Sequence, residues 1–73
     1  MNKGDLVWIP SDITLLQFRT EEASSVDLAV NRWLKVKEPS NVLLVEKGDI
    51  YYKVFHEGER WHARKIDVYE AGV

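Results

Sequence analysis

Two histidines and two carboxylates fall close together in the last third of the chain. His56 and His62 flank the run Glu57-Gly58-Glu59, which places imidazole and carboxylate groups that can ligate a metal in one short segment. In the β-hairpin argued below, the two histidines lie on opposite faces, where they cannot share one ion. We therefore expect two surface histidines, no metal site and no cofactor.

Paired carboxylates can also perform general acid–base chemistry, which needs partly buried acids that face one cleft. The pairs Glu21-Glu22 and Glu57/Glu59 both fall in polar turn segments, so we expect solvated charges there. The serines lie far in sequence from both histidines, and the chain has neither a cysteine nor a glycine-rich phosphate loop. The sequence therefore predicts a protein that is not an enzyme, and catalysis is the third hypothesis behind two binding functions.

One tryptophan is placed for binding rather than for packing. Trp33 shares its strand alternation with Lys35 and Lys37, whereas Leu34 and Val36 between them are apolar and expected to be buried. An outward tryptophan is typical of protein-binding hot spots. Trp33 and Lys35 are thus candidates for a protein contact, and packing of the indole under a large loop is the alternative.

A β-hairpin is predicted around Glu57-Gly58, with the glycine at a positive φ angle. A two-residue turn sets Val54 opposite Trp61, and we expect Trp61 to be buried against Val54 and the opening strand. One face of the hairpin is then core, and the other combines basic and aromatic side chains. The core face holds Ile50, Tyr52, Val54, Trp61 and Ala63, and the other face holds Tyr51, Lys53, Phe55, Arg60, His62 and Arg64.

The basic and aromatic face allows three interpretations. Tyr51 and Phe55, interleaved with Lys53, Arg60 and Arg64, have the composition that stacks bases and holds phosphates, which predicts nucleic-acid binding. The same residues fit a protein contact, or a solvated sheet face on which arginine covers the aromatic rings. A net charge of −2 favours a protein partner over a nucleic acid.

Size and composition limit the architecture. The chain has 73 residues, no cysteine, 45% hydrophobic and 30% charged residues, so residues 1–73 are expected to form one domain held by packing alone. No apolar run reaches the length of a membrane span, and no leader precedes the first apolar run. We expect a soluble protein located in the cytoplasm.

Short apolar runs separated by turn residues predict five or six strands and a small barrel or sandwich. Residues 41–46 are almost continuously apolar, as in a strand buried on both faces. Residues 19–25 are predicted to be a loop, and residues 26–30 a short strand or loop arm, with one helical turn as the alternative. The other predicted strands are residues 6–9, 13–18, 33–37, 50–56 and 59–65.

The last third of the chain also resembles the Src-homology-3-like barrel, including its bacterial variants. In that family a strand with two adjacent aromatic residues leads through a hairpin to another strand, a single 3-10 turn and a closing strand. Residues 48–54, with Tyr51-Tyr52, are similar to the aromatic-pair strand, and residues 61–70 to the strand, turn and closing strand. The resemblance implies that residues 4–9 form the opening strand and residues 11–38 an enlarged first loop.

The resemblance covers about half the chain. It implies the barrel fold of the family more than the family's binding of proline-rich peptides. The acidic-aromatic motif that lines a proline-peptide groove is absent, Arg64 stands near the usual proline, and only Tyr51 matches a groove aromatic. The compact, cysteine-free chain is also similar to small barrel proteins of tailed phages. We therefore expect a protein-binding module that docks on a host factor or a virion component, with nucleic-acid binding as the alternative.

Overall fold

The protein is described by a computed structural model that covers residues 1–18 and 30–71. Within these residues the chain is all-β, and every strand pairing is antiparallel. Seven strands are present rather than five or six, and the strand beyond the six predicted apolar segments is the short β7. The segment that the resemblance assigned to an enlarged first loop contains two strands, at residues 14–18 and 30–35. The elements are β1 (Leu6–Ile9), β2 (Thr14–Phe18), β3 (Val30–Lys35), β4 (Ser40–Lys47), β5 (Tyr51–His56), β6 (Glu59–Arg64), the 3-10 turn η1 (Lys65–Asp67) and β7 (Tyr69–Glu70).

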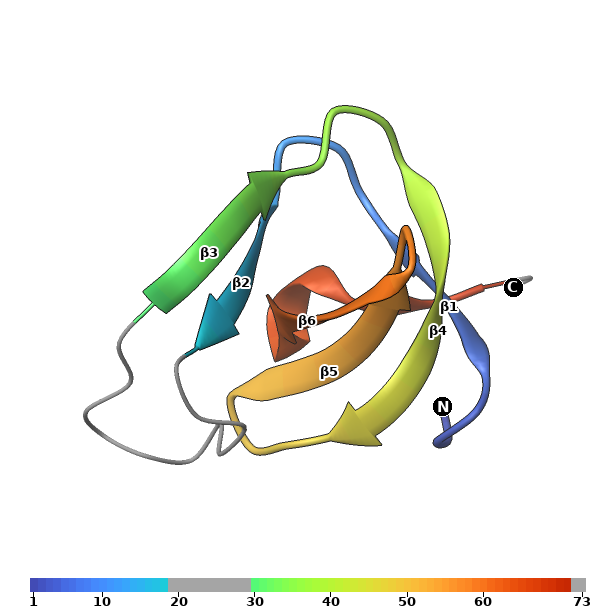
Figure 1. Cartoon of the computed structure of the whole chain (residues 1–73). Coiled ribbons are helices and arrows are strands. Elements are labelled where there is room, and N and C mark those ends of the chain that lie inside the picture. Colours follow the sequence, from blue (N-terminus) through green and yellow to red (C-terminus); the bar gives the residue numbers. More distant parts are fainter. Residues whose placement is uncertain (19–29, 72–73) are drawn as a thin grey trace.

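The described strands form one sheet in the order β3-β2-β6-β5-β4-β1-β7. The sheet is strongly curved, so that β2 and β3 lie on one side of the molecule and β4 and β1 on the other (Figure 1). In the described part of the chain, no hydrogen-bonded pairing joins β3 to β7. The predicted barrel is therefore present as a curved, open sheet, and the predicted 3-10 turn near the C-terminus is confirmed.

The hairpin between β5 and β6 has the predicted register. Val54 pairs with Trp61 and His56 with Glu59, so the turn consists of Glu57 and Gly58 alone. Both turn residues have positive φ angles, 50° and 81°, the pattern of a type I′ turn whose twist matches the flanking strands. A glycine tolerates this conformation freely, whereas a glutamate adopts it at a cost.

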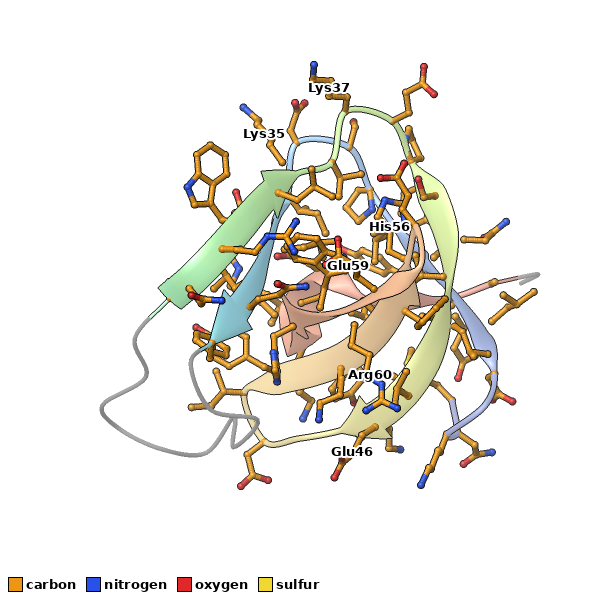
Figure 2. All side chains as sticks on the ribbon, in the orientation of Figure 1. Lys35, Lys37, Glu46, His56, Glu59 and Arg60 are labelled. Carbon is orange, nitrogen blue, oxygen red and sulfur yellow. The ribbon has the colours of Figure 1, made fainter. Side chains whose placement is uncertain are left out.

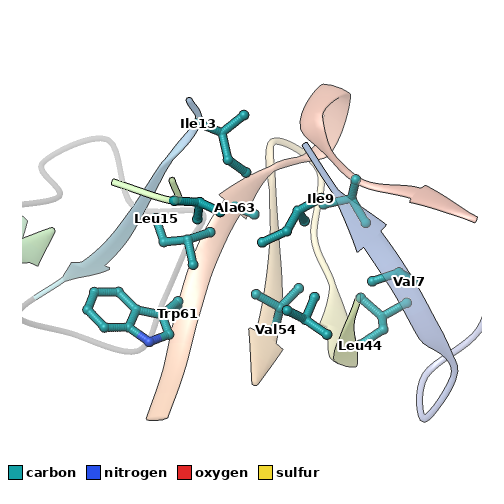
Figure 3. Close-up of a cluster of buried hydrophobic side chains, with 11 residues drawn as sticks. Val7, Ile9, Ile13, Leu15, Leu44, Val54, Trp61 and Ala63 are labelled. Carbon is teal, nitrogen blue, oxygen red and sulfur yellow. The ribbon is translucent and has the colours of Figure 1, made fainter. Parts of the chain in front are cut away.

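The core fills the space that the curved sheet encloses. Its largest member, Trp61, is only 3% exposed, and its indole Nε1 donates to His56 O at 3.2 Å. Figure 3 shows Trp61 beside Leu15 and on the opposite side of the cluster from Val7, so the indole lies toward β2 rather than against β1. The buried cluster comprises Val7, Ile9, Ile13, Leu15, Val36, Val42, Leu44, Val54, Trp61, Ala63 and Val68.

Two apolar side chains that were predicted to be buried are exposed. Ile50 lies in the turn before β5 and is exposed, because the strand begins only at Tyr51. In β4, Val42 and Leu44 are buried while Leu43 between them is exposed. This strand is therefore covered on one face only, and its apolar run continues across a solvent-facing position.

The β2–β3 hairpin is attached to the rest of the sheet through β6. Its ladder pairing with β6 is limited to Leu16 opposite His62, whereas β5 and β6 pair along their whole length. A bulge between Gln17 and Phe18 ends the regular pairing of β2 with β3. Side-chain contacts must therefore supply much of the attachment.

Two predicted segments lie wholly or partly outside the described residues. The predicted loop at residues 19–25 lies outside the described residues, as do residues 26–29 of the predicted arm, whereas Val30 begins β3. The described residues contain no helix that is both long and apolar enough to cross a membrane.

Truncation of the core indole should destabilise the domain severely. We expect Trp61→Ala to lower the free energy of unfolding by about 3–5 kcal/mol, because it leaves a cavity beside Leu15 and removes the bond to His56 O. Urea unfolding followed by circular dichroism measures the change. Trp8→Ala, at a half-buried position that contacts Tyr69, is the matched control and should cost less. Equal stability of Trp61→Ala and the parent would contradict this core.

Relief of the strained turn residue should stabilise the domain. We expect Glu57→Asn to raise the free energy of unfolding by about 0.5–1 kcal/mol, because asparagine adopts positive φ more readily than glutamate does. Glu38→Asn removes the same charge from an exposed position without positive φ and should leave stability nearly unchanged. Equal melting temperatures of the two variants would show that the turn conformation is not the cause.

Candidate functional site

The predicted binding residues separate into two surfaces on different strands. We call Trp33 and Lys35 of β3 the Trp33 surface. We call the residues on the outer side of β5 and β6, opposite the core, the hairpin face. The hairpin face consists of Tyr51, Lys53, Phe55, Arg60, His62 and Arg64.

The Trp33 surface lies on an edge strand of the sheet. Trp33 is 68% exposed, and Lys35 on the same side of the strand is exposed as well. Leu34, which alternates with them, packs against the core, and Val36 is buried, as predicted. Figure 2 shows Lys35 and Lys37 at the end of β3, directed away from the molecule. The structure thus presents an uncovered indole with two nearby cations.

The hairpin face is less basic than its sequence suggests, because carboxylates neutralise two of its cations. Lys53 Nζ lies 3.8 Å from Glu46 Oε2, and the lysine side chain is only 11% exposed. Arg64 Nε donates to Asp67 Oδ2 at 2.9 Å. Arg60 is exposed and makes no ion pair within the described residues.

His62 is buried, which corrects the prediction of two surface histidines. Its ring lies 4.8 Å from that of Phe18 and 6.3 Å from that of Tyr51, measured between centroids, and Phe18 and Tyr51 also contact each other. Phe18 reaches this position because β2 pairs with β6 at His62. The aromatic cluster therefore fastens the β2–β3 hairpin to the outer side of β6.

A second cluster fastens the same hairpin on the core side of β6. The Arg32 guanidinium donates to both carboxylate oxygens of Glu59 and lies 5.4 Å from the centroid of the Trp61 ring. Gln17 Nε2 donates to Arg60 O at 3.0 Å and lies 3.4 Å from Glu59 Oε1. The Arg32 hydrogen bond is the main cause that lowers the pKa of Glu59 below its ordinary value. Glu59 is thus an ion-pair partner and is poorly suited to act as a general base.

A shallow pocket of about 320 Å³ opens between these two clusters. It receives side chains from β2, β3, β5 and β6, and it brings together Lys53 and Arg60 of the hairpin face. Its lining is mostly polar. The lining residues are Gln17, Phe18, Asn31, Lys53, Glu59, Arg60 and His62.

The histidine and carboxylate groups do not assemble into a metal site among the described residues. No group of three or more potential ligands is found there. His56 and His62 belong to opposite faces of the hairpin, as the register requires. The acidic pair Glu21-Glu22 lies outside the described residues.

An apolar row on the outer face of the sheet was missed by the sequence analysis. Leu6 pairs with Leu43, and Leu43 pairs with Phe55, so three exposed apolar side chains lie in register across β1, β4 and β5. Beside this row the ring of Trp8 contacts that of Tyr69 in a tilted arrangement, with centroids 5.5 Å apart and an interplanar angle of 57°. Phe55 therefore borders this apolar row through Leu43 and the exposed cation of the hairpin face through Arg60, its partner in β6. In the sequence Leu43 stands inside a continuous apolar run, so no polar alternation marked it as exposed.

Loss of the Arg32 guanidinium should raise the pKa of Glu59. Because the pKa of Glu59 is lowered in the folded state, the ion pair stabilises the fold above the ordinary glutamate pKa, and this contribution is lost as the pH falls through the lowered value. An NMR titration of the carboxyl carbon should show a higher pKa in Arg32→Ala than in the parent.

The melting temperatures of the parent and Glu59→Gln should accordingly converge in acid. Arg60→Ala removes a neighbouring cation that forms no ion pair with this carboxylate in the described structure, so it should leave the pKa of Glu59 low. An unchanged pKa in Arg32→Ala would contradict the assigned cause.

The described residues present one exposed indole on an edge strand, one partly neutralised hairpin face and one apolar row. No family model, no curated protein and no solved structure matches the chain.

Proposed function

We propose that this chain is a non-enzymatic protein-binding module built as a Src-homology-3-like small barrel. The order of elements supports the fold, since an aromatic-pair strand β5 leads through a tight turn to β6, then to η1 and to a closing strand β7. The closing strand pairs with the opening strand β1, which in turn pairs with β4. The β2–β3 hairpin takes the place of the enlarged first loop.

The observation that carries the binding function is the exposure of Trp33 on the edge strand β3. An indole buries a large apolar area when a partner covers it, and tryptophan is among the residues most enriched in hot spots. Trp33 is the most exposed of the three tryptophans, since Trp61 is buried and Trp8 contacts Tyr69. The strand beneath it is supported by Leu34, which packs on the core, so the indole projects from a rigid element.

The charges favour a protein over a nucleic acid as the partner. Binding to phosphate backbones rests on several uncompensated cations. On the hairpin face, Lys53 and Arg64 are paired with Glu46 and Asp67, which leaves Arg60 as the cation without an ion pair in the described structure. Identification of the partner as a host factor or virion component is a prediction from the sequence.

Removal of the indole should abolish binding without unfolding the domain. We expect Trp33→Ala to keep the parent melting temperature and to lose capture of the partner in an affinity pull-down from native host lysate, performed with and without nuclease. The loss should amount to about 2 kcal/mol or more of binding free energy once the partner is isolated.

The paired control is the double variant Arg60→Glu with Arg64→Glu, which removes the exposed cations of the hairpin face. It should retain protein capture, and nuclease treatment should not change the captured material. Capture that is unaffected in Trp33→Ala but lost in the double variant would place the binding site on the hairpin face. A nuclease-sensitive product would support a nucleic-acid partner instead.

A further inference from the structure

One side of the β3 backbone has no partner strand among the described residues. In the described part of the chain β3 is the terminal strand of the sheet and pairs with β2 alone. The opposite terminal strand, β7, is only two residues long, whereas β3 has six. Long edge strands with free N–H and C=O groups are templates for another extended segment.

The residues that offer these free groups can be named. Val36 N donates to Ile13 O at 2.9 Å and Val36 O accepts from Asp12 N at 2.7 Å, so both backbone groups of Val36 face β2 and the Ile13–Val36 pair ends the β2–β3 ladder. Hydrogen-bonded and non-hydrogen-bonded pairs alternate along antiparallel strands. In the continuous register from this pair, Trp33 and Lys35 occupy non-hydrogen-bonded positions. Their N–H and C=O groups therefore point to the free edge, and Leu16, opposite Trp33, correspondingly pairs with β6 on its other side.

The same two residues carry the exposed side chains of the Trp33 surface. An added strand that bonds to the backbone of Trp33 and Lys35 would place its own side chains beside the indole and the ammonium group. Lys35 and Lys37 are exposed and form no ion pair in the described structure, although Asp12 and Glu38 lie in the adjoining turns. The edge is thus complementary to an extended segment that carries carboxylates.

We propose, on the basis of the protein-binding function above, that the partner adds an extended acidic segment to β3 as an eighth strand. Backbone bonds to Trp33 and Lys35 hold the segment, an apolar side chain of the segment packs on the indole, and a carboxylate pairs with Lys35. A second copy of this chain is a poorer occupant, because its own β3 contains no carboxylate that could pair with Lys35.

The probe is a random library of peptides of about ten residues, a length that covers β3, panned against the full chain. Selected peptides should alternate apolar and acidic residues with the period of two of a strand. Binding of one selected peptide is then measured by fluorescence anisotropy. Selection of proline-rich, basic or helically patterned peptides would overturn the proposal.

A matched pair of substitutions separates the contribution of the Lys35 backbone N–H to peptide binding from that of its ammonium charge. Lys35→Gln removes the ammonium group and keeps the N–H, whereas Lys35→Pro removes both; an edge strand tolerates proline where its N–H faces solvent. Lys35→Pro should bind the peptide at least about tenfold more weakly than Lys35→Gln does. Lys3→Gln, an exposed lysine before β1 and away from β3, is the charge control and should bind like the parent. Equal affinity of the two Lys35 variants would overturn strand addition.

Hydrogen exchange gives a readout that does not depend on how the proline variant folds. In the parent chain the amides of Trp33 and Lys35 should exchange rapidly, and the peptide should slow both by about tenfold or more. Unchanged exchange in the saturated complex would overturn strand addition, yet loss of lysate capture in Trp33→Ala would still support the protein-binding function. Dimers of the free chain that Lys35→Pro dissociates would identify self-pairing instead of an acidic partner.

Discussion

The attachment of the β2–β3 hairpin to β6 is the constraint on which the rest of the structure depends. The backbone contributes one ladder pair there, so side chains on the two faces of β6 must hold the hairpin. Trp61 and His62 are neighbours in β6 and point to opposite faces. The indole is covered by the Arg32–Glu59 pair on the core side, and the imidazole contacts Phe18 on the outer side. Two adjacent residues thereby anchor the same hairpin.

This arrangement also explains why the surfaces differ in character. The groups that resemble a catalytic or cationic site, such as Glu59, His62 and Lys53, are occupied in holding strands together. Strand β3 is the terminal strand of the described sheet. Its outward side chains, Trp33 and Lys35, do not hold another described strand in place. Trp33 and Lys35 can therefore remain exposed on a strand whose other face contacts the core through Leu34.

Local chemistry made part of this structure predictable. The two-residue turn at Glu57-Gly58 sets the β5–β6 register from neighbouring residues, so the burial of Trp61 and its pairing with Val54 follow. Alternation likewise predicted the outward position of Trp33. The burial of His62 was not predictable in this way, because it depends on Phe18. Phe18 is far from His62 in the sequence and lies beside it because β2 pairs with β6. Non-local pairing also decides that the sheet stays open.

The unequal edges of the sheet have a consequence for assembly. Open-ended polymers form when one surface of a molecule fits a different surface of the next copy, so that each addition recreates the growing end. Here a long edge at β3 would need a matching long edge at β7, but β7 offers only two residues. Among the described strands, growth by edge-to-edge stacking therefore has no second long edge. The strand addition proposed above would take place at one end of the sheet only, the end formed by β3.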